Sequence, residues 1–510
     1  MAEFLHEDND VEDRNANAIY GFSDGHDSDV YFEDFIERSE FDARRMEEWE
    51  SEDDGDGDED EDVPPSPSPW TAWTNVLGNF AGVEPFTAKS GPTFDAPENW
   101  TALDYFSLLF GDDLFEMIGV ETNRYARQKL EGTPGLTSWQ DVTLPEIKVY
   151  TGLRILMGVI RLPELKVYWS RNSFYGSITK MFPKIMKWKR FVQITRYLHF
   201  NNSTSKPPFG HPARDRLHKV RPVIEYLVEK FQSKYYPTMN ISVATRMVPF
   251  RGSASFCPDI MPRGLSKDGI KVWAAVDTSN GYVLNFDVDV DELEDQIDHR
   301  SRHTLGFDVV TSMAGPYLGK NHHLYFNKAF TTPALLDHLL QQKTYACAAV
   351  SLSDTNLPAC AKTVKRKKDG QIVRRQCGNV LFTKWHIHGN ANLLSTNCSP
   401  FAPHTPVRPK LRKGKYIYSP EPAVVTLYND SILLDPLEKW FSYYPTARPS
   451  RTWYRYIFWF VVDLAIYNAA VLKAEVLGTQ QKQGDFREEL GEQLVGGLPD
   501  INTWAEEENQ

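Results

Sequence analysis

The pattern of apolar and polar positions changes its period once along the chain. From Ala102 to about residue 236, apolar side chains recur at intervals of three and four residues, as in the runs 103–114, 147–157 and 191–198. This spacing places the apolar side chains on one face of an α-helix. We therefore predict that residues 101–262 form a helical domain.

Farther along the chain the period becomes two. Apolar side chains alternate with their neighbours over residues 270–277, which is typical of a strand, and Asn280-Gly281 then predicts a hairpin. The returning strand is expected at 282–290, strands at 323–327 and 345–350, and helices at 305–313 and 333–340. This order predicts an α/β fold, a mixed sheet with flanking helices, over residues 263–354 and 422–441.

Residues 355–421 interrupt this pattern with a basic, proline-rich insertion. Clusters of bases this large neutralise phosphates, and they are also typical of nuclear import signals, so we expect DNA contact and a location in the nucleus. A solvated loop without a partner is the alternative. The residues expected to bind DNA are Lys365, Arg366, Lys367, Lys368, Arg374, Arg375, Arg412, Lys413 and Lys415.

The most apolar stretch of the chain covers residues 457–472. It contains Asp463 and Asn468, and it is too short and too polar for a membrane span. We therefore expect a buried helix and no membrane partner. It belongs to a second helical segment, residues 442–500, near the end of the chain.

Charge divides the chain into an acidic part and a basic part. The formal net charge is −13, but residues 1–62 alone hold 26 acids and 4 bases, and residues 63–483 carry a net charge of +16. We expect residues 1–95 to be a disordered acidic tail that serves solubility or docks on a basic protein, with a second tail at 501–510. The basic body between them favours a polyanionic partner.

Two carboxylates stand where metal-dependent phosphodiester chemistry can be built. Such chemistry needs acids from separate segments that hold two divalent ions about 3.5–4 Å apart. Asp277 ends the first predicted core strand, and Asp435 begins a later helix. Each also has a structural explanation, because Asp277 can start the Asn-Gly turn and Asp435 can cap its helix. Mg²⁺ is the expected ion if both residues bind metal.

An ordered series of short segments between Leu103 and Gly497 resembles one protein family. The segments include Leu103-Asp104-Tyr105-Phe106, Glu121-Thr122-Asn123-Arg124-Tyr125-Ala126, Arg196-Tyr197-Leu198-His199-Phe200, Val248-Pro249-Phe250-Arg251-Gly252, Gly269-Ile270-Lys271-Val272-Trp273 and Asp463-Leu464-Ala465-Ile466-Tyr467-Asn468-Ala469. In order and extent they are similar to piggyBac-type transposases, and to host proteins derived from them, within the DDE transposase superfamily.

This resemblance implies an RNase H-like catalytic core that is split by the insertion at 355–421. Segments on both sides, 101–262 and 442–500, would form a helical domain for dimerisation and DNA binding. The implied activity is Mg²⁺-dependent strand cleavage and transfer between TTAA sites by a homodimer. In the family's pattern the first catalytic acid falls on Asp277 and the third on Asp435, with Glu438 as a further acid.

The second catalytic position departs from the family's pattern. Asn327 stands where the family has an aspartate, and Lys328 places a cation beside it. An amide keeps a carbonyl oxygen but lacks the negative charge, so metal binding and transition-state stabilisation are both weakened. A second departure is Ala244-Thr245, which stands where the family has an Asp-Glu pair before Pro-Phe-Arg-Gly.

We therefore predict a transposase-derived DNA-binding protein whose site, Asp277, Asn327 and Asp435, has lost or impaired cleavage. One alternative is an active transposase in which Asp287, Asp289 or Glu438 supplies the missing ligand; another is a chromatin or scaffold protein that acts through its acidic tail. Weaker candidates are His322, His323, His386 and His388 as metal ligands, Trp385 as a base-stacking residue, and Arg190, Arg196 and Lys219 as phosphate contacts.

Overall fold

The computed structural model describes most of the chain between residues 72 and 496. The described residues are 72–78, 80, 82–131, 139–170, 175, 178–208, 211, 214–249, 269–289, 302–352, 354–362, 371–386, 390–403, 410–412, 415–417, 421–432, 443–448 and 452–496. The predicted tail at 501–510 and the acidic run within the first 62 residues lie outside this part.

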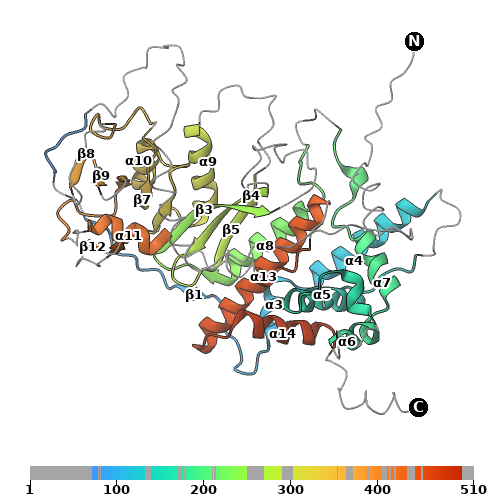
Figure 1. The fold of residues 1–510 in the computed structure, drawn as a ribbon. Coiled ribbons are helices and arrows are strands. Elements are labelled where there is room, and N and C mark those ends of the chain that lie inside the picture. The colour runs from blue at the N-terminus through green and yellow to red at the C-terminus, as the bar shows by residue number, and fades with distance from the viewer. Residues whose placement is uncertain are drawn as a thin grey trace, which may run out of the picture.

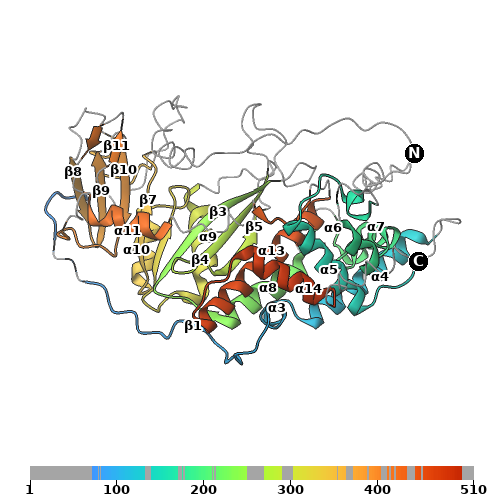
Figure 2. The ribbon, with the colours of Figure 1, turned by 60° about the horizontal axis from the view of Figure 1, so that its bottom comes forward.

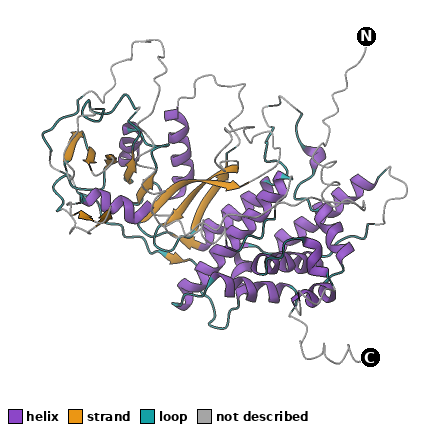
Figure 3. Ribbon diagram, in the orientation of Figure 1, coloured by secondary structure: helices purple, strands orange, loops and turns teal. Residues whose placement is uncertain are grey.

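An eight-stranded mixed sheet runs from the middle of the molecule to the end that lies opposite the helical bundle (Figures 1 and 3). Its strands, in spatial order, are β5 (Val283–Val288), β4 (Gly269–Asp277), β3 (Asn240–Pro249), β6 (His323–Phe326), β7 (Tyr345–Ala349), β10 (Asn390–Ser395), β9 (Val380–His386) and β8 (Ile372–Cys377). Strands β3, β6 and β7 are parallel to one another, and the other neighbours are antiparallel. The predicted α/β class is confirmed at this level.

Strand β3 corrects the predicted boundary between the helical domain and the core. Residues 101–262 were expected to be helical, but the helices end with α8 (Arg221–Lys234), and β3 then lies between β4 and β6. Ile241 and Val243 already show the alternation of a strand, and both are fully buried. The boundary at 262/263 is therefore wrong, because the sheet begins at residue 240.

The predicted insertion also proves to be partly integral to the sheet. Residues 355–421 were expected to form a separate insertion domain, yet β10 pairs with β7, with Leu393 opposite Ala349, and β9 and β8 follow as the outer strands. Among the described residues of 355–421, only the short hairpin of β11 (Lys410–Arg412) and β12 (Lys415–Ile417) forms a sheet of its own. The main sheet is therefore wider than the sequence predicts.

Helices cover both faces of the sheet. On β5, Asn285 donates hydrogen bonds to backbone carbonyls at the end of α9 (Arg302–Ala314), and its neighbour Phe286 points to the opposite face, where it lies 5.9 Å from Phe231 of α8. Helix α10 (Pro333–Gln341) packs on the outer strands, and α11 (Ala423–Ile432) packs on β3, β6, β7 and β10. Tyr325 of β6 lies in the same apolar cluster as residues of α11.

Helices from both ends of the described chain form one bundle beside the sheet (Figure 2). Its members are α3 (Ala102–Leu109), α4 (Asp112–Leu130), α5 (Leu144–Val159), α6 (Ile178–Ile185), α7 (Trp188–Tyr197), α8, α13 (Trp453–Leu477) and α14 (Gln483–Leu494). Helix α13 is long and apolar enough to cross a membrane, but 89% of its most apolar 18-residue window is buried inside the protein. It is the buried helix that the sequence predicts.

A buried ion pair joins the last two helices of the bundle. Arg487 of α14 lies 2.7 Å from Asp463 of α13, and neither side chain reaches solvent appreciably. The same carboxylate accepts hydrogen bonds from the backbone N–H and the hydroxyl of Thr446. Because an uncompensated buried charge is costly, this network fixes α13 and α14 relative to each other.

An extended segment, residues 72–100, runs along the sheet and the bundle (Figure 2). Thr74 pairs with Gln376 at the edge of β8, and β1 (Gly91–Pro92) pairs with β2 (Tyr235–Tyr236). Trp73 packs against Phe382 and donates a hydrogen bond to a backbone carbonyl. The predicted disordered tail, 1–95, is therefore wrong at its end, since its described residues are attached to the fold.

Candidate active site and basic surfaces

Asp277 is the expected first catalytic acid, and its side chain is fully buried at the end of β4. Its Oδ1 accepts hydrogen bonds from the Thr238 hydroxyl and from the backbone N–H and hydroxyl of Ser279, at 2.7–2.9 Å. Its Oδ2 accepts hydrogen bonds from the Thr238 backbone N–H at 2.6 Å and from the Tyr235 hydroxyl at 3.1 Å. A carboxylate has about four lone-pair sites, so these five donors leave none for a metal.

The surroundings of Asp277 also keep the Tyr235 phenol protonated, so that it can donate a hydrogen bond. Burial, and then the negative charge of Asp277, raise the pKa of the Tyr235 phenol well above its ordinary value. The turn that follows β4 is tied to α13, because Asn280 donates hydrogen bonds to Tyr235 and Glu475. Asp277 therefore holds together the end of β4, the segment before β3 and the β4–β5 turn.

Asn327, the expected second catalytic position, lies at a different level of the sheet. In the parallel pair of β3 and β6, Val243 is opposite Phe326, so Asn327 follows beside Ala244. Asp277 is opposite Ile241, three residues earlier on β3 and on the far side of that strand. With about 3.3 Å per residue along a strand and about 4.8 Å between strands, the two positions are roughly 14 Å apart. The structure does not bring Asp277 and Asn327 together.

The residue beside Asn327 is Ala244, which the sequence analysis noted only as a departure from the family's acidic pair. Strand alternation puts Ser242 and Ala244 of β3 on the same face as Tyr325 and Asn327. The Asn327 amide oxygen accepts a hydrogen bond from the Ala329 backbone at 3.1 Å, which helps to form a turn. Sequence reasoning missed Ala244 because it assigned the first core strand to residues 270–277, one strand too late.

The third and fourth expected acids, Asp435 and Glu438, lie outside the described residues. The last described residue before them is Ile432, at the end of α11. Helix α11 packs on β3 and β6, on the face that carries Tyr325. Ile432 therefore ends a helix that covers the face on which Ala244 and Asn327 lie.

Asp287 and Asp289, the proposed substitute ligands, are engaged elsewhere. Asp287 forms an ion pair with Arg221 at 3.2 Å, and Asp289 forms one with Lys271 at 2.8 Å. The register places Ala244 opposite Ala274, which is in turn opposite Phe286, so Asp287 points to the other face of the sheet. Neither acid can complete a site at Ala244. Across the described part of the chain, no three metal-binding side chains of His, Cys, Asp or Glu come together.

The histidine candidates have structural roles in the described region. His322 is buried, and its ring nitrogens lie 3.0 Å from the Thr238 carbonyl and 3.4 Å from the Tyr236 hydroxyl. Burial, and secondly the neighbouring His322, lower the pKa of His323 to about 4. His386 ends β9, and His388 lies outside the described residues. Trp385 is buried in the α11 cluster, so it is not available to stack on a base.

The predicted basic residues are only partly described. Arg374 and Arg375 lie on the edge strand β8, half-buried, and Arg375 donates a hydrogen bond to the Arg374 carbonyl at 2.7 Å. Arg412 and Lys415 occupy opposite positions in the β11–β12 hairpin. Lys365, Arg366, Lys367, Lys368 and Lys413 lie outside the described residues. The structure thus places two arginines on an outer strand of the sheet.

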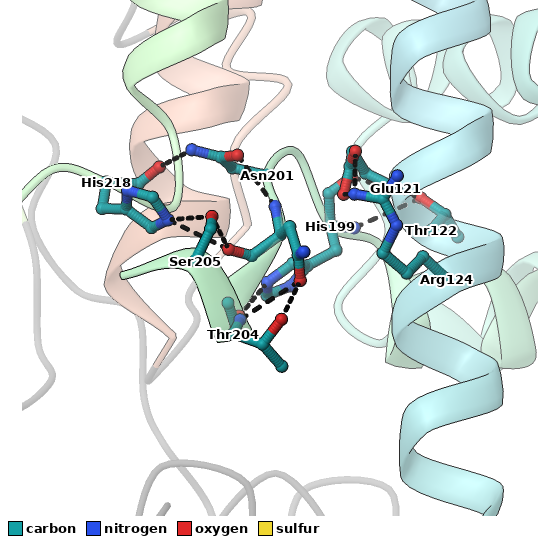
Figure 4. Close-up of polar contacts among 10 residues, drawn as sticks. Glu121, Thr122, Arg124, His199, Asn201, Thr204, Ser205 and His218 are labelled. Carbon is teal, nitrogen blue, oxygen red and sulfur yellow. Dashed lines mark hydrogen bonds and ion pairs between the residues drawn. The ribbon is translucent and has the colours of Figure 1, made fainter. Parts of the chain in front are cut away.

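A second basic surface lies on the connection between α7 and α8. Asn201 donates a hydrogen bond to the His218 carbonyl at 2.6 Å, and the His218 ring contacts the Asn202 carbonyl at 3.0 Å (Figure 4). On the α4 side, the His199 backbone N–H bonds the hydroxyl of Thr122. This braced connection carries Lys206, Arg214, Arg216 and Lys219.

The other two phosphate candidates of the helical domain differ from each other. Arg190 forms two hydrogen bonds of 2.6 Å with Glu146 and stacks over Trp139, so its role is structural. Arg196, at the end of α7, is exposed. Lys219 lies 4.8 Å over the ring of Tyr454. Of the three predicted phosphate contacts in this domain, Arg196 and Lys219 therefore remain candidates.

Comparisons with known proteins agree with one another. A family model described as Transposase IS4 matches residues 101–470. Human PiggyBac transposable element-derived protein 5 is 25% identical over 423 residues, which cover 81% of this chain and 78% of that protein. Human PiggyBac transposable element-derived protein 2 is 26% identical over 381 residues, which cover 71% of this chain and 60% of that protein.

A solved structure has a similar fold. It is the cryo-EM structure of a piggyBac transposase synaptic complex with hairpin DNA. The match covers 82% of this chain and 87% of the transposase chain, with a TM-score of 0.68. The sequence identity is 19%, so this likeness concerns the fold.

Proposed function

The chain belongs to the piggyBac transposase family, and we propose that it is a DNA-binding protein that lacks metal-dependent strand cleavage. The observation that carries this proposal is the pair of Ala244 and Asn327 on adjacent parallel strands. Both occupy positions where the resemblance places an acid, and neither has a carboxylate. The site is therefore more degraded than the sequence analysis predicted, because two acidic positions are neutral.

The described residues of this site do not fit Mg²⁺. The ion requires hard, charged oxygen ligands in near-octahedral geometry. Ala244 offers no oxygen from its side chain, and the Asn327 amide oxygen already accepts a hydrogen bond from Ala329. Asp277 is about 14 Å away by strand spacing, with its oxygens occupied. We therefore derive no catalytic step through a metal at this site.

The order of the central strands supports an RNase H-like core for this protein. Strands β5, β4 and β3 form an antiparallel meander, and β6 and β7 continue it in parallel beyond β3. Two neutral residues then sit at the same level of the two central strands, β3 and β6. We expect this arrangement in an RNase H-like core that has lost its acidic residues, and our proposal for the catalytic site is based on it.

DNA binding is supported by charge and by the fold. Residues 63–483 carry a net charge of +16, and the similar solved structure is that of a transposase in complex with DNA. Arg374 and Arg375 on β8 and the α7–α8 connection are the described surfaces that we assign to phosphate contacts. We also propose a nuclear homodimer whose acidic N-terminal segment binds a basic protein.

A salt titration of DNA affinity tests the binding part of the proposal. Each phosphate contact contributes about 0.9 to the slope of log affinity against log salt concentration. Replacing Arg374 and Arg375 with alanine should therefore lower the slope by about 2. The matched control is Lys320→Ala with Lys343→Ala, two exposed bases elsewhere on the surface. Equal slopes for both double variants would exclude β8 from the interface.

A cleavage assay tests the loss of catalysis. DNA that carries TTAA sites is incubated with the native chain, with Asn327→Asp, and with the double variant Ala244→Asp/Asn327→Asp, each with and without Mg²⁺. We expect no metal-dependent cleavage from the native chain or from Asn327→Asp. Metal-dependent cleavage by the native chain that is abolished by Asn327→Ala overturns the proposed function.

A further inference from the structure

A groove lies at the N-terminal end of α5. It has a volume of about 440 Å³, and its lining includes Pro145 and Val149 from α5 and Ile185, Met186, Lys187 and Arg190 from the α6–α7 corner. Arg190 is neutralised by Glu146, also in the lining, at 2.6 Å. The groove thus combines an apolar floor with one exposed cation, Lys187, at its rim.

The face of α5 that lines the groove near its N-terminal end is covered by α14 nearer its C-terminal end. A Cβ atom built on Gly152 would lie 2.8 Å from Leu494 and 2.9 Å from Val495, and one built on Gly491 would lie 2.6 Å from Leu156. The two helices can approach this closely only because both contact positions are glycine. Pro145 and Val149 precede Gly152 by seven and three residues, so they continue this face past the end of α14.

The chain leaves α14 in the direction of the groove. Residue 491 lies beside Leu156, and Leu494 and Val495 lie beside Gly152, so α14 runs antiparallel to α5 toward its N-terminal end. The groove begins roughly 5–10 Å farther along α5, given a rise of 1.5 Å per residue. The eight residues from Gly497 to Trp504 can span up to roughly 26 Å. Segment 497–510 therefore starts within reach of the groove.

The composition of segment 497–510 matches the groove. It contains Leu498, Ile501 and Trp504 at intervals of three, followed by Glu506, Glu507 and Glu508. We propose that this segment binds in the groove of its own chain, with Trp504 against Val149 and Met186 and the glutamates beside Lys187. A tryptophan buries more apolar area than most side chains, and Lys184 and Lys189 add two exposed cations near the acidic end.

This binding gives the groove a structural role in the bundle. The α6–α7 corner contacts α5 through the ion pair of Arg190 with Glu146, and the segment would join both of these to α14. It would shield Met186, whose carbonyl accepts a hydrogen bond from Trp169, and it would prolong the α5–α14 contact to the first turn of α5. This inference does not depend on DNA binding or on the state of the catalytic site.

Zero-length cross-linking of the full chain tests the contact directly. A carbodiimide joins an amine to a carboxylate with loss of water, so we expect an amide bond between Lys187 and one of Glu506, Glu507 and Glu508. In an equal mixture of unlabelled and isotope-labelled chains, the two peptides of each cross-link should both be labelled or both be unlabelled. Linkages of mixed isotope would show that a second copy fills the groove, and the absence of any linkage would exclude the contact. Either result overturns the proposal.

Hydrogen exchange provides a second test that does not need a reactive pair. In the native chain, amides of residues 498–505 should exchange about tenfold more slowly than in the variants Val149→Asp and Trp504→Ala. Val120→Asp is the matched control, since Val120 is 56% exposed on α4. If Val149→Asp fails to fold, Trp504→Ala carries the comparison alone. Exchange at the rate of an unprotected chain in the native protein overturns the proposal.

Discussion

Two positions along strand β3 differ in the residues that lie beside them. Beside Ile241, Asp277 is fully buried and accepts five hydrogen bonds. Beside Val243, the next positions on β3 and β6 are Ala244 and Asn327, and neither carries a charge. A carboxylate is present where it accepts five hydrogen bonds from the fold, and no carboxylate is present at the two positions where the resemblance places acids. The proposed loss of cleavage predicts this difference.

The largest effect should come from Asp277→Ala. The substitution leaves the buried hydroxyl of Tyr235 and the half-buried donors of Thr238 without an acceptor, which costs about 3 kcal/mol of unfolding free energy. Urea unfolding at neutral pH without divalent ions measures it. Asp308→Ala, an exposed acid on α9, is the control and should change little. If Asp277 were a metal ligand in an open site, its removal without metal would leave stability unchanged or raise it.

A pH effect of similar size should arise at the first residue of β6. His323 is buried between the Tyr345 ring, Asn397 and His322, and its pKa is lowered to about 4, mainly by burial. The unfolded chain binds the proton near pH 6.5, so native stability is complete above that pH and is lost as the pH falls toward 4. The loss should reach roughly 3 kcal/mol.

Unfolding of His323→Phe across the same pH range tests this assignment. The variant should show a flatter dependence between pH 6.5 and 4 than the native chain. Because His322 also has a lowered pKa through burial, a residual slope is expected in the variant. If the unfolding free energy of the variant depends on pH as steeply as that of the native chain, the titrating group is not His323.

Restoring the acids should create a metal response at the Asn327 end of β6. For Ala244→Asp/Asn327→Asp, Mg²⁺ at about 100 times its dissociation constant should raise the unfolding free energy by about 2.7 kcal/mol. The native chain should show no specific shift, and Asn327→Asp should show little. Thermal unfolding with Mg²⁺ and with EDTA measures the difference. A Mg²⁺ shift in the native chain would mean that metal ligands persist there.

The family, the α/β class and the buried helix α13 were predictable because they rest on local signals. Periodicity and ordered segments reveal which residues are buried, and the spacing of Asp277 and Asn280-Gly281 predicts a turn. The sequence does not reveal which strands are neighbours. Asp277 was therefore taken as a partner of Asn327, whereas the pairing of β3 with β6 selects Ala244. In the same way, nothing local indicates that β10 pairs with β7.

The smallest effect should come from Asn327→Ala, the matched counterpart of Asp277→Ala beside β3, three residues farther along that strand. It removes one side-chain hydrogen bond, from the Ala329 backbone N–H at 3.1 Å, at a solvent-exposed turn. The freed N–H can bind water, so the cost should stay below about 1 kcal/mol. The backbone carbonyl of residue 327 still accepts hydrogen bonds from the Phe330 backbone N–H and the Thr331 hydroxyl, because the substitution does not change that carbonyl. Urea unfolding could instead show that Asn327→Ala lowers the unfolding free energy as much as Asp277→Ala does. Asn327 would then also be required by the fold, and the presence of asparagine in place of the family's aspartate would not indicate lost catalysis.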